Sequence, residues 1–219
     1  HITMNIIWFK DCSYQNKNLV GGKNASLGEL YKLSKDLKFN IADGFALTID
    51  LYDQFILQNE FLEKIKQELQ NVDPNNIDQL NTTAKNIKNL IQMGFFTPDQ
   101  KQQILENYNR LRTRYNNTLQ VAVRSSAIAE DLPGASFAGQ QDTYLNIETP
   151  EDLIESIIKC YASLFNARAI SYRYTNKIDF SQVKMSVAIQ KMVRSDMGSA
   201  GVAFSIDPET GYNKAVVIN

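Results

Sequence analysis

A run of small and polar residues in the middle of the chain has the composition of a phosphate-binding segment. It begins at Arg124 and reads R-S-S-A-I-A-E-D-L-P-G-A-S-F-A-G-Q-Q-D-T up to Thr143. An arginine guanidinium is planar and permanently charged, so it can bind two phosphate oxygens at once. Backbone N–H groups of glycine and other small residues can approach a polyanion closely. We predict phosphate contacts from Arg124, Ser136, Gly139 and Thr143, although a strand, a solvated loop and a second strand would give the same pattern without a ligand.

A lysine beside a glycine pair is the second candidate for anion binding. The sequence V-G-G-K ends at Lys23, and apolar residues at helical spacing follow it. The first turn of a helix carries unpaired N–H groups and the positive end of the helix dipole, which together favour an anion. We therefore predict a phosphate contact for Lys23. The alternative is a solvated lysine next to a tight turn.

The third candidate lies at the end of a long apolar, β-type run. The sequence there is Gln190-Lys191-Met192-Val193. Backbone N–H and C=O groups at a strand end can bind the edge of an adenine ring while a methionine packs on its face. We predict adenine binding for Gln190, Met192 and Val193, and an ordinary strand end is the alternative.

Alternating strands and helices are expected to position these residues. Capping signals at Thr97-Pro98 and Thr149-Pro150 predict two helix starts. A single helix is predicted across 51–69, and a short apolar strand is predicted to end where the run at Arg124 begins. The remaining predictions are a strand at 6–9, a helix from Gly22 with Leu27, Leu30, Leu33 and Leu37 on its apolar face, a helix carrying Leu80, Ala84, Ile87 and Ile91, and strands at 183–193, 201–206 and 215–218.

Composition limits the function classes that need to be considered. The chain has 219 residues, 43% of them hydrophobic, and its 23 Lys and Arg against 24 Asp and Glu give a formal net charge of −1. No overall field therefore attracts nucleic acid or an anionic membrane. Cys12 and Cys160 lie far apart without C-x-x-C spacing, so we predict buried free thiols and a cytoplasmic location rather than a zinc site or a disulfide framework. We expect His1–Thr3 to be a non-native remnant, and no other histidine occurs in the sequence.

Five sequence blocks resemble the phosphoenolpyruvate synthase family, and they occur in the same order. They are V-G-G-K-N-A-S-L-G-E-L at 20–30, V-R-S-S-A-I-A-E-D-L-P-G-A-S-F-A-G-Q-Q-D-T-Y-L-N at 123–146, L-F-N-A-R-A-I-S-Y-R at 164–173, Q-K-M-V-R-S-D at 190–196 and F-S-I-D-P-E-T-G at 204–211. Pyruvate phosphate dikinase and rifampin phosphotransferase are built on the same nucleotide domain. The last two blocks are most similar to the synthase.

This resemblance implies an α+β fold of the ATP-grasp type, in which two lobes hold ATP between them. Residues 4–189 would form the amino-terminal lobe and residues 190–219 the start of the second. Lys23 and Arg124 would contact phosphates, the loop around Gly134–Gly139 would cover them, and Gln190–Val193 would receive adenine. In the family, ATP phosphorylates a histidine on a separate domain with the help of Mg²⁺, releasing AMP and phosphate, and the phosphohistidine then phosphorylates pyruvate.

Parts of that machinery are missing from the sequence. The family's magnesium ligands would lie beyond Asn219, and Asp207 and Glu209 belong to a D-P-E-T-G sequence typical of a turn. No residue matches the phosphohistidine, so no catalytic residue and no metal ligand is predicted. We expect an ATP-binding fragment that does not complete the reaction alone. The alternatives are a fragment of a rifampin phosphotransferase or pyruvate phosphate dikinase type of enzyme, and a noncatalytic nucleotide-binding module.

Overall fold

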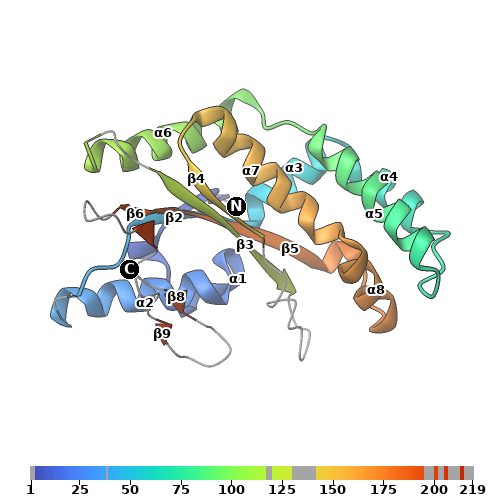
Figure 1. Cartoon of the computed structure of the whole chain (residues 1–219), viewed down its shortest axis with the longest axis horizontal. Coiled ribbons are helices and arrows are strands. Elements are labelled where there is room, and N and C mark those ends of the chain that lie inside the picture. Colours follow the sequence, from blue (N-terminus) through green and yellow to red (C-terminus); the bar gives the residue numbers. More distant parts are fainter. Residues whose placement is uncertain are drawn as a thin grey trace.

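A five-stranded antiparallel sheet with helices on both faces forms the centre of the molecule (Figure 1). The structure is a computed structural model that describes residues 3–37, 39–116, 120–129 and 142–194, together with short strands at 200–201, 205–206 and 213–214. The predicted α+β class is confirmed. No helix in the described part of the chain is long and apolar enough to cross a membrane.

The middle of the sheet is built by strands that lie far apart in the sequence. The order is β1-β2-β5-β3-β4, and β5 pairs with β2 on one side and with β3 on the other. The strands are β1 (Ile6–Trp8), β2 (Gly44–Leu47), β3 (Val121–Ala129), β4 (Thr143–Ile147) and β5 (Val183–Lys191). Four two-residue strands form two further pairs, β6 (Val193–Arg194) with β7 (Ala200–Gly201) and β8 (Ser205–Ile206) with β9 (Asn213–Lys214).

The expected end of the strand before Arg124 was wrong. β3 continues to Ala129 because it pairs with β5 over its whole length, from Val121 opposite Lys191 to Ala129 opposite Val183. Arg124 is therefore a residue inside a central strand. Of the strand predicted at 201–206, β7 and β8 cover the two ends, and the strand predicted at 215–218 lies outside the described residues.

The helices lie in two layers on opposite faces of the sheet (Figure 1). One layer holds α1 and α2, and the other holds the helices that follow β2. Their bounds are α1 (Lys17–Val20), α2 (Gly22–Leu37), α3 (Ile49–Gln58), α4 (Phe61–Leu69), α5 (Ile77–Gln92), α6 (Pro98–Arg114), α7 (Pro150–Ala162) and α8 (Ala167–Thr175). The described residues also include the 3-10 turns η1 (Phe9–Asp11), η2 (Tyr14–Asn16), η4 (Ser163–Phe165) and η5 (Phe180–Gln182).

Both predicted helix caps are confirmed. The Thr97 hydroxyl accepts from the Gln100 N–H at 3.2 Å, and the Gln100 side chain accepts from the Thr97 N–H at 3.0 Å, which is a complete capping box at the start of α6. The Thr149 hydroxyl accepts from the Asp152 N–H at 3.1 Å at the start of α7. The capping residues thus set where both helices begin.

The helix predicted across 51–69 is two helices. The chain breaks at Glu60, whose φ of 57° is left-handed, so α3 and α4 meet at an angle. Asn59 fixes this break, because its side chain donates to the Phe55 carbonyl at 2.8 Å and the Phe95 carbonyl at 3.0 Å, and accepts from the Phe95 N–H at 3.1 Å. A contact 36 residues away therefore ends α3.

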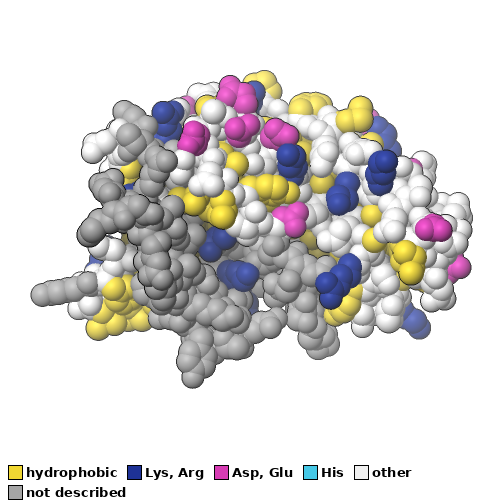
Figure 2. All heavy atoms as spheres, viewed as in Figure 1, with side chains coloured by type: hydrophobic (Ala, Val, Ile, Leu, Met, Phe, Trp, Pro, Cys, Tyr) yellow, Lys and Arg dark blue, Asp and Glu magenta, His cyan; other side chains and the backbone are white. Residues whose placement is uncertain are grey.

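The two helix layers cover different cores. The larger core lies under α3 to α8 and contains Phe55 and Tyr161, whose ring centres are 5.2 Å apart. The smaller core lies under α1 and α2 and includes Phe9, Val20, Ala25, Leu27 and Ala188. The apolar face predicted for α2 was too long, because Leu33 and Leu37 are 50% and 65% exposed. Both basic and acidic side chains appear on the surface drawn in Figure 2.

Both cysteines are free and fully buried, as the sequence analysis predicted. Burial, with a smaller contribution from Asp11, raises the pKa of the Cys12 thiol to about 12, and burial raises that of Cys160 as well. The thiolate is the reactive form, so neither thiol should react with a disulfide reagent such as DTNB in the native protein at pH 8. Both should react in 6 M guanidinium. Release of one equivalent of thionitrobenzoate by the native protein within minutes would contradict this prediction.

Candidate functional site

The two faces of the central sheet differ in chemistry. Side chains alternate between faces along a strand, and Val121, Val123, Val187 and Ile189 point into the larger core. The intervening residues Arg124, Ser126, Ser186 and Gln190 therefore share the opposite face, on which α1 and α2 lie (Figure 1). A row of polar side chains on two central strands is unusual for a packed face, and it marks this face as the candidate site.

Arg124 is held at a defined position in this row. It lies opposite Ala188 on β5 and Thr143 on β4, and one of its guanidinium nitrogens, Nη2, donates to the side-chain oxygen Oε1 of Gln190. The side chain is half-buried, and burial lowers the pKa of the guanidinium. An arginine pKa starts so high that the group keeps its charge at neutral pH. No carboxylate of the described residues forms an ion pair with it.

The turn before Lys23 lies directly against β3. Gly21 has a φ of 87°, and a Cβ atom at this position would lie 2.7 Å from the Ser126 hydroxyl. Glycine is therefore required both by the backbone conformation and by the close approach to the strand. α2 begins at the next residue, as predicted, and Lys23 is half-buried in its first turn. The start of α2 thus lies on the same face of the sheet as Arg124.

Asn24 ties the first turn of α2 to both neighbouring elements. Its side-chain amide donates to the Val20 carbonyl at 2.8 Å and lies 3.4 Å from the Ser186 hydroxyl on β5. The residue is 3% exposed, so these contacts replace its contacts with water. The binding of one anion by Lys23 and Arg124 remains a prediction. The start of α2, which carries Lys23, lies on the sheet face to which Arg124 belongs.

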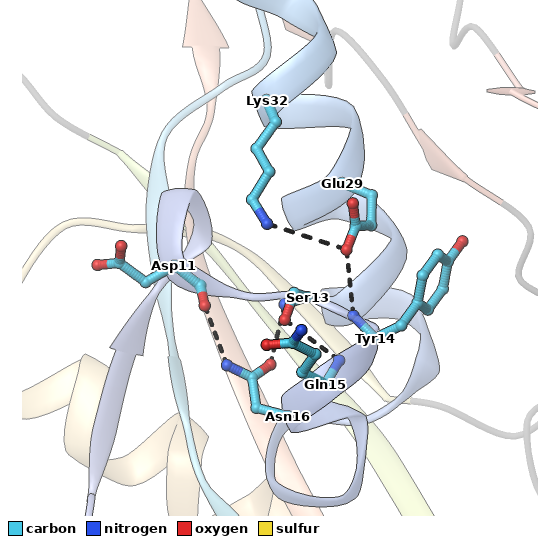
Figure 3. A network of polar contacts seen from close by, with 7 residues as sticks. All are labelled: Asp11, Ser13, Tyr14, Gln15, Asn16, Glu29 and Lys32. Atoms are coloured by element: carbon cyan, nitrogen blue, oxygen red, sulfur yellow. Dashed lines mark hydrogen bonds and ion pairs between the residues drawn. The ribbon is translucent and has the colours of Figure 1, made fainter.

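A polar network upstream of α2 fixes the chain segment that leads to the glycine turn (Figure 3). Ser13 and Asn16 form a capping box at η2, and the Asn16 amide donates to the Asp11 carbonyl at 2.9 Å. The Tyr14 N–H donates to the carboxylate of Glu29 on α2 at 3.2 Å. The hydrogen bond between Tyr14 and Glu29 therefore holds the segment before the glycine turn against α2. This limits the positions that Lys23 can take.

The strand end predicted to bind adenine is closely packed. Gln190 is 1% exposed, and its Nε2 donates to the Ala42 carbonyl at 3.0 Å. The Met192 N–H donates to the Gln120 carbonyl at 2.8 Å, and the Met192 sulfur accepts from the Asn146 N–H at 3.1 Å. These contacts position the strand end, and adenine binding there remains a prediction.

Sequence comparison then decides the family. The family described as pyruvate phosphate dikinase, AMP/ATP-binding domain, matches residues 17–219, which include all of the residues discussed above that could bind a nucleotide. The chain belongs to this family. The predicted membership in the superfamily, which the sequence blocks indicated, is confirmed.

Curated relatives of this AMP/ATP-binding domain are phosphoenolpyruvate synthases. The chain is 49% identical over 214 residues to the one from Helicobacter pylori. The aligned residues cover 97% of this chain and 26% of the relative. It is 42% identical over 215 residues to the one from Aquifex aeolicus, covering 98% and 25%. It is 39% identical over 213 residues to the one from Escherichia coli K12, covering 97% and 27%. The chain thus spans about a quarter of the length of these relatives.

The remaining predicted site residues of the AMP/ATP-binding domain are only partly described. Thr143 is exposed at the start of β4, opposite Arg124. Val193 belongs to β6, and its side chain lies outside the description. Ser136, Gly139 and the covering loop at 134–139 lie outside the described residues. Their phosphate contacts stay predictions.

Sequence reasoning missed an ion pair that borders the strand end of the domain. Asp43 is 5% exposed, its carboxylate pairs with Arg114, and its carbonyl accepts from the Lys191 N–H at 2.9 Å. The Arg114 guanidinium lies 4.8 Å from the centre of the Trp8 ring. The Asp43-Gly44 pair was the available sequence signal. In the structure this glycine has no room for a Cβ, because the Ile189 carbonyl oxygen lies only 2.2 Å from the Cβ position.

Two further observations concern where a metal ion or a ligand could bind in this domain. In the described part of the chain, no three His, Cys, Asp or Glu side chains lie close enough together to hold a metal ion. A cavity of about 640 Å³ lies between α4, α8 and η5, and it is lined by residues such as Leu62, Lys66 and Tyr174. None of the predicted site residues lines it, so its size alone does not make it the nucleotide site.

Proposed function

We propose that the chain is the ATP-binding part of a phosphoenolpyruvate synthase, which converts ATP, pyruvate and water to phosphoenolpyruvate, AMP and phosphate. The observation that carries the proposal is the charged Arg124, held inside a central strand on the sheet face against which the start of α2 packs. The names of the relatives support the choice of synthase.

In this proposal, Arg124 and Lys23 bind the phosphate chain of ATP. Two fixed cations lower the energy of the charge that builds up on a transferring phosphoryl group, and catalysis of such transfers is mostly positioning and charge stabilisation. Ser136, Gly139 and Thr143 add neutral donors. Gln190, Met192 and Val193 form the adenine end of the site, where the methionine side chain would pack on the ring.

The acceptor chemistry belongs to the whole enzyme. A histidine on a separate domain would carry the phosphoryl group to pyruvate, and Met4–Asn219 contains no histidine. Magnesium would neutralise part of the triphosphate charge, with ligands expected beyond Asn219. The described residues offer no cluster of His, Cys, Asp or Glu that fits the ion.

The proposal also keeps a division into a lobe of residues 4–189 and the start of a second lobe at 190–219, and a cytoplasmic location. β5 remains paired in the sheet up to Lys191, so Gln190 and Lys191, the first residues of the proposed second lobe, still lie in the sheet, and the chain would leave it only after this strand. Limited proteolysis of the full-length enzyme should then cut after 191 more readily than within β5.

The activity is tested on the full-length enzyme that contains this chain. AMP and phosphoenolpyruvate should form from ATP only when pyruvate is present, without added phosphate. A requirement for inorganic phosphate, with diphosphate as product, would identify a pyruvate phosphate dikinase instead. Transfer to rifampin and not to pyruvate would equally overturn the proposal.

The isolated 219-residue chain should bind Mg-ATP only weakly and should not turn it over. With only part of the ATP site's charge partners present, we expect a dissociation constant of about 1 mM, equivalent to about 4 kcal/mol. Calorimetric titration measures the affinity, and an assay of AMP release with pyruvate present measures turnover. Micromolar binding would show that this chain completes the site, and pyruvate-dependent AMP would contradict the need for a separate histidine domain.

A further inference from the structure

The side chain of Gln190 links Arg124 to the backbone in front of β2. Its Oε1 accepts from the Arg124 guanidinium, and its Nε2 donates to the Ala42 carbonyl at 3.0 Å. We propose that Gln190 is a positioning residue, which holds the Arg124 guanidinium in place for the nucleotide phosphates. The proposal rests on the phosphate-binding role proposed above for Arg124, and it concerns a side chain whose predicted role was adenine binding.

The register of the sheet brings the two side chains together. Arg124 lies opposite Ala188, and Gln190 lies opposite Ala122, so the two residues are diagonal neighbours on one face of the β3–β5 pair. Long side chains in this relation can reach each other across antiparallel strands. The contact joins residues that are 66 positions apart, and both lie within strands, so it does not depend on the conformation of a loop.

The orientation of the Gln190 amide follows from its other partner. Gln190 is buried, and the Ala42 carbonyl can only accept, so the amide nitrogen must face Ala42 and the amide oxygen must face Arg124. Ala42 is itself fixed, since the next residue, Asp43, accepts from the Lys191 N–H at 2.9 Å and pairs with Arg114. The acceptor for Arg124 is thus anchored before any ligand arrives.

A neutral acceptor suits an arginine that must bind an anion. A carboxylate at position 190 would pair with the guanidinium and cancel much of its charge, whereas an apolar side chain would leave it unanchored. The glutamine amide directs one N–H of the guanidinium and leaves the positive charge uncompensated within the described residues. A guanidinium has five N–H donors, so others can donate to phosphate oxygens.

The test is a double-mutant cycle in the full-length enzyme, with Gln190→Leu, Arg124→Ala and the double variant. Gln190→Leu should lower kcat/KM for ATP by about 10- to 100-fold, the range for losing a hydrogen bond to a charged group. In the Arg124→Ala background the same change should cost less than about 2-fold, because the group that Gln190 positions is gone. The ratio of kcat/KM for ATP to that for GTP should not change.

Two controls separate positioning from folding. Gln100→Leu removes another buried glutamine, whose side chain bonds Gln58 and accepts from the Thr97 N–H at the start of α6, so it should lower stability while leaving kcat/KM for ATP near normal. Gln190→Met is a second variant that keeps the unbranched shape, and it should reproduce the loss if Gln190→Leu folds poorly. Thermal unfolding of every variant reports whether the fold is intact.

Each other result has a definite reading. A loss of the same size in both backgrounds would overturn the proposal, because Gln190 would then act without Arg124. A changed ATP to GTP ratio would instead assign Gln190 to adenine. Normal kinetics of folded Gln190→Leu or Gln190→Met would overturn the positioning role alone, whereas normal kinetics of Arg124→Ala would overturn the phosphate role and the positioning role together.

Discussion

Replacing Arg124 by alanine should lower the turnover of the full-length enzyme by about 100-fold or more. That is the scale expected when one preorganised donor to a developing charge is removed. Arg124 is anchored by Gln190, and β3 is paired on both sides, so the guanidinium is a preorganised donor. The measurement is pyruvate-dependent AMP formation at saturating and limiting ATP.

Two further variants decide whether the effect is specific. Arg124→Lys keeps a positive charge but loses the planar fork, so it should retain part of the activity. Arg110→Ala removes an exposed arginine of α6 that lies over the Trp8 ring, 5.1 Å from its centre, and should leave turnover nearly unchanged. A near-normal rate for Arg124→Ala would reject its role as a phosphate ligand.

Among substitutions in α2 that add a single methyl group, Gly28→Ala should be the most destabilising. A Cβ atom at this position would lie 1.9 Å from the Cys12 carbonyl oxygen and 2.5 Å from its carbonyl carbon. Both are backbone atoms in a segment held by the network of Figure 3, so they cannot move aside cheaply. We expect a loss of about 3 kcal/mol or more in the free energy of unfolding, well above the gain of about 1 kcal/mol that alanine brings to a helix.

Gly22→Ala is the matched control for this substitution. Gly22 begins the same helix, and the nearest atom to its Cβ position is the end of the Lys17 side chain at 3.7 Å, an ordinary contact. This variant should be as stable as the unmodified chain or slightly more stable. Urea unfolding of both variants measures the difference, and equal midpoints would show that α2 can move away from Cys12.

Local sequence signals predicted features that depend on neighbouring residues. Thr97 and Thr149 begin helices because their hydroxyls bond N–H groups only three residues away. Lys23 follows a glycine turn, and its place in the first turn of α2 was correct for the same reason. Arg124 was selected for its chemistry alone, and its predicted structural setting at the end of a short strand was wrong.

The errors lie where distant residues decide the structure. Asn59 ends α3 through Phe95, and β3 extends past Val123 because β5 lies beside it. The Gln190 contact with Arg124 depends on the register of the same two strands, which a single sequence does not display. The predicted apolar face of α2 extended to Leu33 and Leu37 because helical spacing shows which residues share a face but not how far the covered surface reaches.

The central position of β5 has a consequence for the order in which the protein can be assembled on the ribosome. β1 and β2 are made early, and β3 and β4 later, but neither pair can join the other until the residues up to Lys191 have emerged. Until then β2 and β3 each expose an unpaired edge, which invites pairing with other chains. A nascent chain that stalls before Val183 is made should therefore depend on chaperones. A chain that stalls only after Lys191 has left the ribosomal tunnel can close its sheet.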